Sequence, residues 1–598
     1  MKLFLERFFY AMLIYASLCF FACTPDDLSE ADKDADKDAD KEDVTPPWHD
    51  KDENEGQDPE PQPDVTPSYD NLAAYDYLKN YVDRTRYPNF KVGAAIPVSD
   101  FLKMSQRYDM AVNNLDEMTA ENAMKPYIQR PDIKNDFSIV ETFLDEAQKA
   151  GVSVFGHTLA WHSQHTPYLY EVIKGRKIEN PSSEAIPQVL FEEDFQGGGT
   201  SLMYWGNDSS ADNVDGTFVI SNPSEVVDWQ AQIAFDVAES FIPGHIYQLK
   251  FRIKGSSEGD IRLFLQNFND GYVSVGDFGT ISFDTQWKDV DVTAECIAEG
   301  GLRVIFNIGH FAGDIYLDDL VFIDTDSVYT YEPYTEHERK EVVAAEMDRW
   351  IKAIMEVSAT RVSAWDAVNE PISDTDSDGD GIHELHRGWG GNTTFFWQDY
   401  LGDIDYVRIV IEKARKYYAE YGGKEPLRLF INDYCLESYW DDNKKLRSLI
   451  HWINLWESDG VTRIDGIGSQ MHTSYSENPE SQRIREEHYV KMLELMVETG
   501  KLVRISELDL GYEDRNGRTL MASELTDEQH RAMAGYYEFI VRKYLEIVPP
   551  DQQYGIAHWA PVDPPENSWR GGEPVGLWDI NYNRKYAYAG FANGLMGD

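Results

Sequence analysis

The sequence predicts an α/β protein, a (β/α)8 TIM barrel that is interrupted after strand three by a jelly-roll β-sandwich. Two observations predict the barrel. From Tyr69 onward, short apolar segments alternate with amphipathic helical segments, and polar residues follow the apolar segments at their C-terminal ends. This alternation is typical of a parallel sheet whose strands are joined by helices. A third observation predicts the sandwich, because helical periodicity disappears between residues 187 and 326 and short alternating strands replace it.

Residues 1–23 have the features of a lipoprotein signal peptide. Lys2 and Arg7 supply positive charge, an apolar core runs from Phe8 to Phe21, and the Phe-Phe-Ala-Cys sequence ending at Cys23 resembles a lipobox. The core is shorter than the ~20 residues that a membrane span needs. We therefore expect an exported outer-membrane lipoprotein that meets the membrane only through lipid on Cys23. An uncleaved signal anchor is the alternative.

Residues 24–68 predict an extended acidic linker. The segment repeats Ala-Asp-Lys-Asp, becomes rich in Glu, Asp and Pro, and has almost no apolar residues. Such a composition cannot bury enough surface to offset the entropy of ordering. The acidic residues after Cys23, namely Asp26, Asp27 and Glu30, resemble the surface-export signals of Bacteroidetes lipoproteins. We expect the linker to hold a cell-surface protein away from the membrane.

Charge and cysteine content exclude several classes of protein. A net charge of −52 argues against nucleic-acid partners and against binding to anionic lipid surfaces. The four cysteines form neither a disulfide framework nor a zinc pattern. An aromatic content of 13% is compatible with a protein that stacks on sugar rings. We expect a monomer.

The predicted barrel strands fall into two blocks of sequence, residues 69–186 and 327–598. They are Lys91–Ala95, Val112–Glu117, Ser153–His157, Ala364–Val368, Leu427–Ile431, Gly466–Gln470, Val503–Glu507 and Gly555–Trp559. Helices are predicted at Ile139–Ala150, Glu336–Met355, Tyr406–Tyr421 and Asp527–Tyr544. Because the chemistry of such barrels lies at the C-terminal strand ends, the residues that follow each strand are the candidate site.

Two carboxylic acids lie at the ends of the predicted fourth and seventh strands. Glu370 follows Asn369 and precedes Pro371, a residue that cannot continue a strand ladder. Glu507 lies in an alternating segment that places it on the same face as Asp509. Two carboxyl groups at one barrel mouth are what glycoside hydrolysis requires. The alternative is a pair of surface acids, since 106 residues of the chain are acidic.

The motifs at the strand ends, in their order, resemble glycoside hydrolase family 10, the endo-β-1,4-xylanases. They are Glu-Asn-Ala-Met-Lys at 121–125, Gly-His-Thr-Leu-Ala-Trp-His at 156–162, Asn-Glu at 369–370, Asn-Asp-Tyr at 432–434, Gln-Met-His at 470–472, Glu-Leu-Asp at 507–509 and His-Trp at 558–559. The resemblance covers residues 69–186 and 331–591. It implies a retaining endo-xylanase that acts on xylan and xylo-oligosaccharides and requires no cofactor.

The resemblance also implies roles for individual residues. Glu370 would be the general acid/base and Glu507 the nucleophile, while Asn369 would hydrogen-bond the 2-hydroxyl of the reacting sugar. His472 would contact the nucleophile, with Asp509 orienting it. The other implied substrate-binding residues are Glu121, Asn122 and Lys125 on the non-reducing side, His157 and Trp161 as subsite walls, Tyr434 on the leaving side, Gln470, and Trp559 and Trp569 as the roof of the cleft. A barrel glycanase for β-glucan or cellulose and a surface glycan-binding protein that does not cleave are the alternatives.

The segment 187–326 predicts an inserted carbohydrate-binding module. Its predicted strands are Gln230–Val237, Ile246–Ile253, Ile261–Phe268, Trp287–Val292, Leu302–Ile308 and Ile315–Phe322. The sequences at 191–195, 228–232 and 313–320 resemble carbohydrate-binding modules of the jelly-roll type, and inserts at this position are seen in xylanases of gut Bacteroidetes. Trp205, Trp229 and Tyr272 are the candidate stacking residues. A structural domain without sugar affinity is the alternative, as is a core position for Trp229.

The segment after Glu370 contains a possible cation loop. Asp374, Asp376 and Asp378 alternate before Gly379, as in the first half of a calcium loop. The twelfth position lacks the glutamate of a complete EF-hand. Two interpretations stay open, a structural calcium site and a solvated acidic loop.

Overall fold

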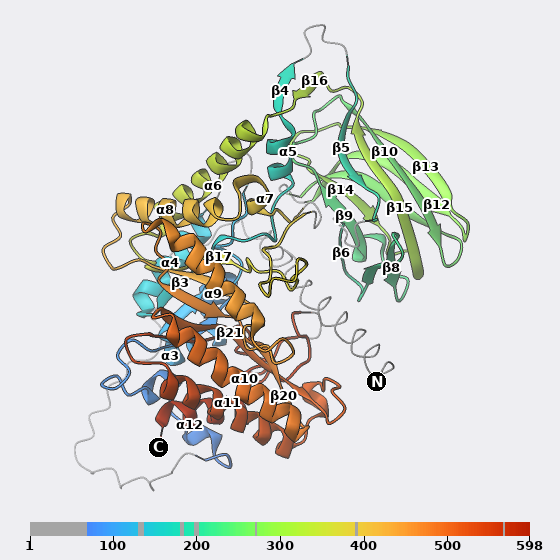
Figure 1. Cartoon of the computed structure of the whole chain (residues 1–598). Coiled ribbons are helices and arrows are strands. Elements are labelled where there is room, and N and C mark those ends of the chain that lie inside the picture. The colour runs from blue at the N-terminus through green and yellow to red at the C-terminus, as the bar shows by residue number, and fades with distance from the viewer. Residues whose placement is uncertain are drawn as a thin grey trace, which may run out of the picture. The chain divides into compact units, whose positions relative to one another are not determined.

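The computed structural model describes residues 68–128, 137–179, 185–196, 202–268, 272–388, 393–565 and 568–597 (Figure 1). The predictions for the signal peptide, for Cys23 and for nearly all of the linker lie outside the described residues. Of the described residues, 68–76 belong to one unit, in which the 3-10 turn η1 spans Leu72–Ala74, and those from Tyr77 onward belong to a second. None of the helices in the described part of the chain is long and apolar enough to cross a membrane.

Eight parallel strands close into a barrel. Each strand pairs with the next one in the chain, and the last pairs back with the first, which closes the sheet. The strands are β1 (Lys91–Ala95), β2 (Glu117–Thr119), β3 (Ser153–Ala160), β17 (Ala364–Asn369), β18 (Arg428–Asp433), β19 (Gly466–Ser469), β21 (Leu502–Glu513) and β22 (Gln553–His558). The short strand β20 (His472–Ser476) continues the sixth position and pairs in parallel with the second half of β21. The predicted barrel is confirmed.

Helices cover the outer face of the barrel, so its strands are buried on both sides and are rich in apolar residues. Two of the long helices begin with a capping box, in which the side chains of the cap and of the third helical residue satisfy each other's backbone N–H groups. The helices are α2 (Val98–Leu102), α3 (Gln106–Asn114), α4 (Ser138–Ala150), α5 (Tyr168–Lys174), α6 (Glu336–Ser358), α7 (Trp397–Leu401), α8 (Asp405–Glu420), α9 (Lys444–Trp456), α10 (Pro479–Glu498), α11 (Asp527–Ile547) and α12 (Tyr586–Met596).

The prediction for the second strand was wrong over most of its length. Residues up to Asn114 belong to helix α3, and the strand begins only at Glu117. Met110, Ala111 and Asn114 are buried, and their spacing places them on one face of that helix. A short apolar run does not by itself distinguish a helix end from a strand. The other predicted barrel strands and helices differ from the structure mainly at their ends.

Between β3 and α6 the chain forms a β-sandwich. It is entered through β4 (Arg176–Glu179) and left through β16 (Tyr329–Glu332), and these two strands pair antiparallel. One sheet contains β5 (Gln188–Glu193), β7 (Ser210–Asn213), β8 (Phe218–Asn222), β10 (Ile246–Gly255), β13 (Lys288–Glu295) and β15 (Gly313–Asp324). The other contains β6 (Met203–Trp205), β9 (Gln232–Asp236), β11 (Gly259–Asn267), β12 (Val273–Phe283) and β14 (Arg303–Asn307).

Alternate residues from both sheets of the sandwich form one apolar core. The six strands predicted from the sequence all exist, with shifted ends. Strands β5 to β8 and β12 were not predicted. In β12 the glycines at 276 and 279 interrupt the alternation, and two register shifts occur against β11.

Candidate active site

Glu370 and Glu507 both lie at the C-terminal mouth of the barrel. Glu370 directly follows β17, and its N–H donates to the carbonyl of Asn432 at 2.8 Å. Its φ of +50° is in the left-handed region, which costs a non-glycine residue about 1 kcal/mol or more. Glu507 lies within β21, and its N–H donates to the carbonyl of Gln470 at 3.2 Å. Neighbouring strand ends therefore fix the backbone of both carboxylic acids.

Three side-chain amides connect the two carboxyl groups. Asn432 Nδ2 donates to Glu507 Oε1 and to Asn369 Oδ1, both at 2.8 Å. Gln470 Nε2 donates to Glu370 Oε1 at 2.8 Å, and Asn369 Nδ2 donates to the same oxygen at 3.2 Å. All three amides are buried. Because buried hydrogen bonds hold each amide in one orientation, the positions of the two carboxyl groups are coupled.

His472 lies between Glu507 and a second buried carboxylate. Its Nε2 is 3.4 Å from Glu507 Oε2, and its Nδ1 is 2.8 Å from Asp509 Oδ2. Asp509 also accepts hydrogen bonds from Trp569 Nε1 at 3.1 Å and from Arg570 Nη1 at 2.5 Å. The prediction that Asp509 lies behind the histidine therefore agrees with this geometry.

The charges around His472 and Asp509 favour the ionised form of Glu507. Burial alone would lower the pKa of His472, but the charges of Asp509 and Glu507 and its hydrogen bonds to them raise that pKa to about 10. Burial opposes ionisation of Glu507, yet the His472 hydrogen bond and nearby cationic groups outweigh it and lower the pKa of Glu507. Near neutral pH, His472 is thus a cation that faces a carboxylate.

Glu370 has a different environment. Trp161 Nε1 donates to its Oε2 at 2.9 Å, and among the described residues this indole and the amides of Asn369 and Gln470 are its side-chain hydrogen-bond donors. His162 Nε2 is 4.0 Å from the same oxygen. Mainly because the imidazole is buried, the pKa of His162 is lowered. The immediate hydrogen-bond donors to Glu370 are therefore uncharged.

Several predicted subsite residues gather beside the first three strands. Lys125 Nζ donates to Asn122 Oδ1 at 2.8 Å and lies 4.9 Å from the ring centre of Trp161 and 5.6 Å from that of Trp559. His157 packs edge-on against Trp559, with ring centres 5.4 Å apart. Glu121 directly precedes Asn122 and has a φ of +39°. These residues share one side of the mouth, whereas their contacts with a sugar stay a prediction.

Tyr434, which is predicted to face a leaving-side sugar, packs against a buried lysine. Lys445 Nζ lies 3.1 Å from the centre of the Tyr434 ring, 3.3 Å from Asp433 Oδ1 and 2.9 Å from Asp374 Oδ1. The Tyr434 hydroxyl donates to Asp374 Oδ2 at 3.0 Å. Burial raises the pKa of Asp433 to about 7, although the charge of Lys445 opposes this shift. Tyr434 is therefore held against the barrel by both its ring face and its hydroxyl.

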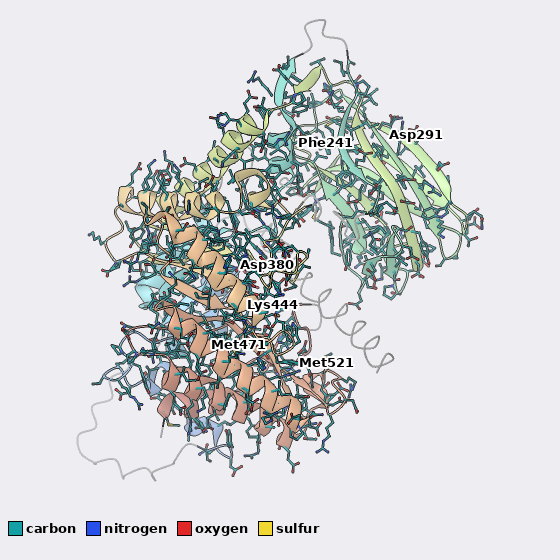
Figure 2. All side chains as sticks on the ribbon, viewed as in Figure 1. Phe241, Asp291, Asp380, Lys444, Met471 and Met521 are labelled. Carbon is teal, nitrogen blue, oxygen red and sulfur yellow. The ribbon has the colours of Figure 1, made fainter. Side chains whose placement is uncertain are left out.

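The same contacts bear on the candidate calcium loop. Within this loop, the carboxylates that come within 4.8 Å of one another are those of Asp376, Asp378 and Asp380, a group that does not include the predicted ligand Asp374. Asp374 instead neutralises Lys445, a partner far away in the sequence. Lys444 Nζ pairs with Asp376, and both Lys444 and Asp380 are labelled in Figure 2. The lysine charge opposes cation binding here, and a bound calcium stays a prediction.

The three aromatic candidates of the sandwich occupy different environments. Trp205 is half-buried, and its Nε1 donates to Gln232 Oε1 at 2.8 Å. Trp229 lies on the 3-10 turn η3 (Asp228–Gln230) and is 59% exposed, so a core position for it is excluded. Tyr272 is 49% exposed.

Four residues that build the site were not predicted as members of it, namely His162, Asp366, Asn432 and Arg570. His162 and Asn432 lie within the quoted motifs, so the motifs themselves were the missed signal. Asp366, in β17, holds His157 Nδ1 at 2.9 Å. Arg570 lies in a loop after β22, and no local pattern in the sequence points to it.

The chain matches the family model described as Glycosyl hydrolase family 10 over residues 82–190 and 330–594, which is more than half of its length. It belongs to that family. Residues 191–329 of this family 10 chain lie between the two matched segments. They contain nearly all of the two antiparallel sheets of the sandwich.

Curated relatives of this family 10 chain are similar to it over half of its length or less. Endo-1,4-beta-xylanase A of Cellvibrio japonicus is 27% identical over 267 residues, which is 42% of this chain and 39% of the relative. Endo-beta-1,4-xylanase Xyn10C of the same organism is 27% identical, with 39% of this chain and 36% of the relative covered. The chain thus spans little more than a third of the length of these two. Endo-1,4-beta-xylanase A of Halalkalibacterium halodurans is 26% identical and is covered over 71% of its length.

Solved structures are also similar. The structure of xylanase B from Clostridium stercorarium F9 has a TM-score of 0.49 at 16% identity, covering 87% of this chain and all of that one. Native xylanase10C from Cellvibrio japonicus has a TM-score of 0.49 at 18% identity, covering 88% of this chain and 73% of that one.

Proposed function

We propose that this family 10 chain hydrolyses internal β-1,4-xylosidic bonds of xylan with retention of configuration, with Glu370 as acid/base and Glu507 as nucleophile. The observation that carries the proposal is the contrast between the two carboxyl environments. Glu507 faces a cationic histidine, whereas the hydrogen-bond donors to Glu370 are neutral. The cationic partner assigns Glu507 as the anionic nucleophile, and the carboxyl group with neutral donors, Glu370, is then the acid/base.

In the first step, Glu507 attacks the anomeric carbon while the bond to the leaving oxygen breaks and Glu370 gives that oxygen its proton. The product is a glycosyl ester of Glu507. The Asn369 amide is positioned beside the acid, where it can bind the 2-hydroxyl of the reacting sugar. His472 stabilises Glu507 as an anion before attack and as a leaving group afterwards.

In the second step, Glu370 takes a proton from water, and the resulting hydroxide attacks the same carbon and releases Glu507. Both steps use Glu370 and Glu507, and the three side-chain amides keep these two carboxyl groups in the same relative position throughout. The xylan specificity rests on the named relatives, three of which are endo-1,4-β-xylanases. The reaction requires no cofactor.

The sandwich is proposed to hold the polymer. On the outer face of its five-stranded sheet, Gln232 Nε2 donates to Asn307 at 2.7 Å, and Arg303 lies 4.4 Å from the Phe268 ring and 5.4 Å from the Trp205 ring. Gln266 is buried, and its Oε1 has no hydrogen-bond partner among the described residues. Fixed amides beside aromatic rings suit the hydroxyl groups and apolar faces of sugars.

We also propose that the protein is an exported, monomeric outer-membrane lipoprotein, exposed at the cell surface and anchored through Cys23. The support is the lipobox-like sequence together with the acidic residues that follow it. Cys23→Ala should abolish labelling with a fatty-acid probe in cells. Continued labelling would reject this anchor.

The test of the activity is hydrolysis of soluble xylan, β-glucan and carboxymethyl-cellulose by the wild type and by Glu370→Gln. Release of short xylo-oligosaccharides that falls at least about 100-fold in the variant supports both substrate and acid/base residue. Preferential release of sugars from β-glucan or carboxymethyl-cellulose would show instead that the protein is a glycanase for β-glucan or cellulose. Binding without release from any polymer would reject catalysis.

A further inference from the structure

We propose that the loop after the fifth barrel strand, residues 434–443, carries a distal leaving-side subsite for a β-1,4-linked pyranose, formed by Tyr439, Trp440 and Glu437. The inference rests on the proposed function, because it assumes that a polysaccharide chain crosses the mouth between Glu370 and Glu507. It adds an aromatic surface for a sugar ring, on the loop 434–443, that none of the residues discussed above supplies.

The order of strands fixes the direction in which this chain would run. Glu370 follows the fourth strand and Glu507 lies on the seventh, so the line between them divides the mouth in two. One half is bounded by β22, β1, β2 and β3, where Asn122, Lys125 and Trp559 gather. The other half is bounded by β18 and β19. A chain that crosses this line must therefore leave over the loops that follow these two strands.

Two adjacent aromatic side chains are exposed on the loop after β18. Tyr439 is 37% and Trp440 44% exposed, and their ring centres are 5.2 Å apart in an edge-to-face arrangement. Isolated exposed aromatic residues are common, but an adjoining pair exposes a continuous apolar surface. The rings of pyranoses present matching apolar faces, which is why tryptophan and tyrosine bind them.

The loop is fixed against the two strands that carry the nucleophile side of the site. Arg485 lies 5.7 Å from the ring centre of Tyr439. The same guanidinium donates to the carbonyl of Ser474 at 2.5 Å and to Glu513 Oε2 at 2.6 Å. Ser474 belongs to β20, which begins at His472, and Glu513 ends β21. The aromatic pair is thus anchored to the strands that hold His472 and Glu507.

Glu437 lies between Tyr434 and this pair in the sequence, and it is close enough to His472 for that charge to act on its pKa. Burial raises the pKa of Glu437 to about 7, although its own backbone N–H and the charge of His472 oppose the rise. Its Oε2 is buried without a hydrogen-bond partner in the described part of the chain. A partnerless buried carboxyl oxygen is costly unless a ligand satisfies it. A sugar hydroxyl that enters beside Tyr434 would supply that hydrogen bond.

The test compares a substrate that reaches the loop with one that does not. Xylohexaose extends several sugars past the cleaved bond, whereas 4-nitrophenyl β-xylobioside places a single ring there. For Trp440→Ala, kcat/KM on xylohexaose should fall about fivefold to tenfold, the value of one aromatic stacking contact. Activity on the aryl substrate should be unchanged, and Trp440→Phe should restore most of the loss.

The control is Tyr77→Ala. Tyr77 is 41% exposed, but it lies beside the turn η2 (Leu78–Tyr81), which precedes the N-terminal end of β1. An equal fall on both substrates, or no fall on xylohexaose, would overturn the distal subsite while the xylanase activity of the wild type stands. A wild type that cleaves neither substrate would instead reject the proposed function and this inference with it.

Discussion

Replacement of Asp509 by asparagine tests whether a buried carboxylate keeps His472 cationic. The substitution preserves shape but removes the charge that contributes most to raising the pKa of His472. Asp509 is fully buried and touches His472, Trp569 and Arg570. Arg570 keeps its second partner, Glu573, at 2.7 Å. We therefore expect a loss of about 3 kcal/mol near neutral pH, the low end for breaking a buried ion pair.

The pH dependence follows from the sign of the shift. The pKa of His472 is raised to about 10 in the folded protein, and the unfolded value is about 6.5. Between these values the folded chain keeps a proton that the unfolded chain has lost. The stability that His472 contributes is thus fully present below about pH 6.5 and declines by about 1.4 kcal/mol per pH unit up to about pH 10. In Asp509→Asn most of this decline should vanish.

The assay is urea unfolding of the two proteins at about pH 7 and about pH 9, followed by tryptophan fluorescence of the barrel. The stability difference between wild type and variant should shrink by about 2 kcal/mol between the two conditions. Asp465→Asn is the matched control, since Asp465 pairs with Arg415 and Arg463 rather than with a histidine. A difference for Asp509→Asn that stays constant with pH would refute the assignment of His472 as a cation.

Three further perturbations test other parts of the site. Glu370→Ala should lose xylan hydrolysis, while azide should restore turnover of 4-nitrophenyl β-xylobioside and give a β-glycosyl azide; an α-product would contradict retention. Lys445→Met leaves Asp433 and Asp374 without their counter-charge, so the free energy of unfolding should fall by about 3 kcal/mol, which thermal unfolding measures. An unchanged midpoint would show that this cluster does not stabilise the fold. Gln266→Met should weaken xylan retention in affinity gels about threefold to tenfold, whereas Gln248→Met on the opposite sheet should not; equal retention by both would favour a structural sandwich.

The parts of the site that the sequence could predict are those with local signals. Glu370 directly follows one strand and Glu507 lies within another, and apolar periodicity locates both strands. Adjacent motif residues mark Gln470 and His472. Asn432 was missed even though the Asn-Asp-Tyr motif contains it, because its contact with Glu507 joins side chains of two strands that are not neighbours in the sheet.

Long-range electrostatic pairing also lies beyond what the local sequence can predict. The alternating aspartates suggested that Asp374 binds a cation, and a cation is indeed beside it, but it is the Lys445 ammonium group from helix α9. No spacing rule within a loop can anticipate a partner that lies 71 residues away. Similarly, the sequence left a core position open for Trp229, whereas the ring lies exposed on a 3-10 turn.

The antiparallel pair β4 and β16 has a consequence for how the barrel assembles. The third and fourth barrel strands are separated by the whole sandwich, so bringing them together closes a long loop at an entropic cost. Once the sandwich has folded and β4 has paired with β16, Arg176 is opposite Glu332, so the residues of the sandwich no longer lengthen the loop between the two barrel strands. We therefore expect the folded sandwich to hold the third and fourth barrel strands near each other while the barrel forms. Mutations that weaken its core should slow barrel formation during synthesis while leaving the turnover of each folded molecule unchanged.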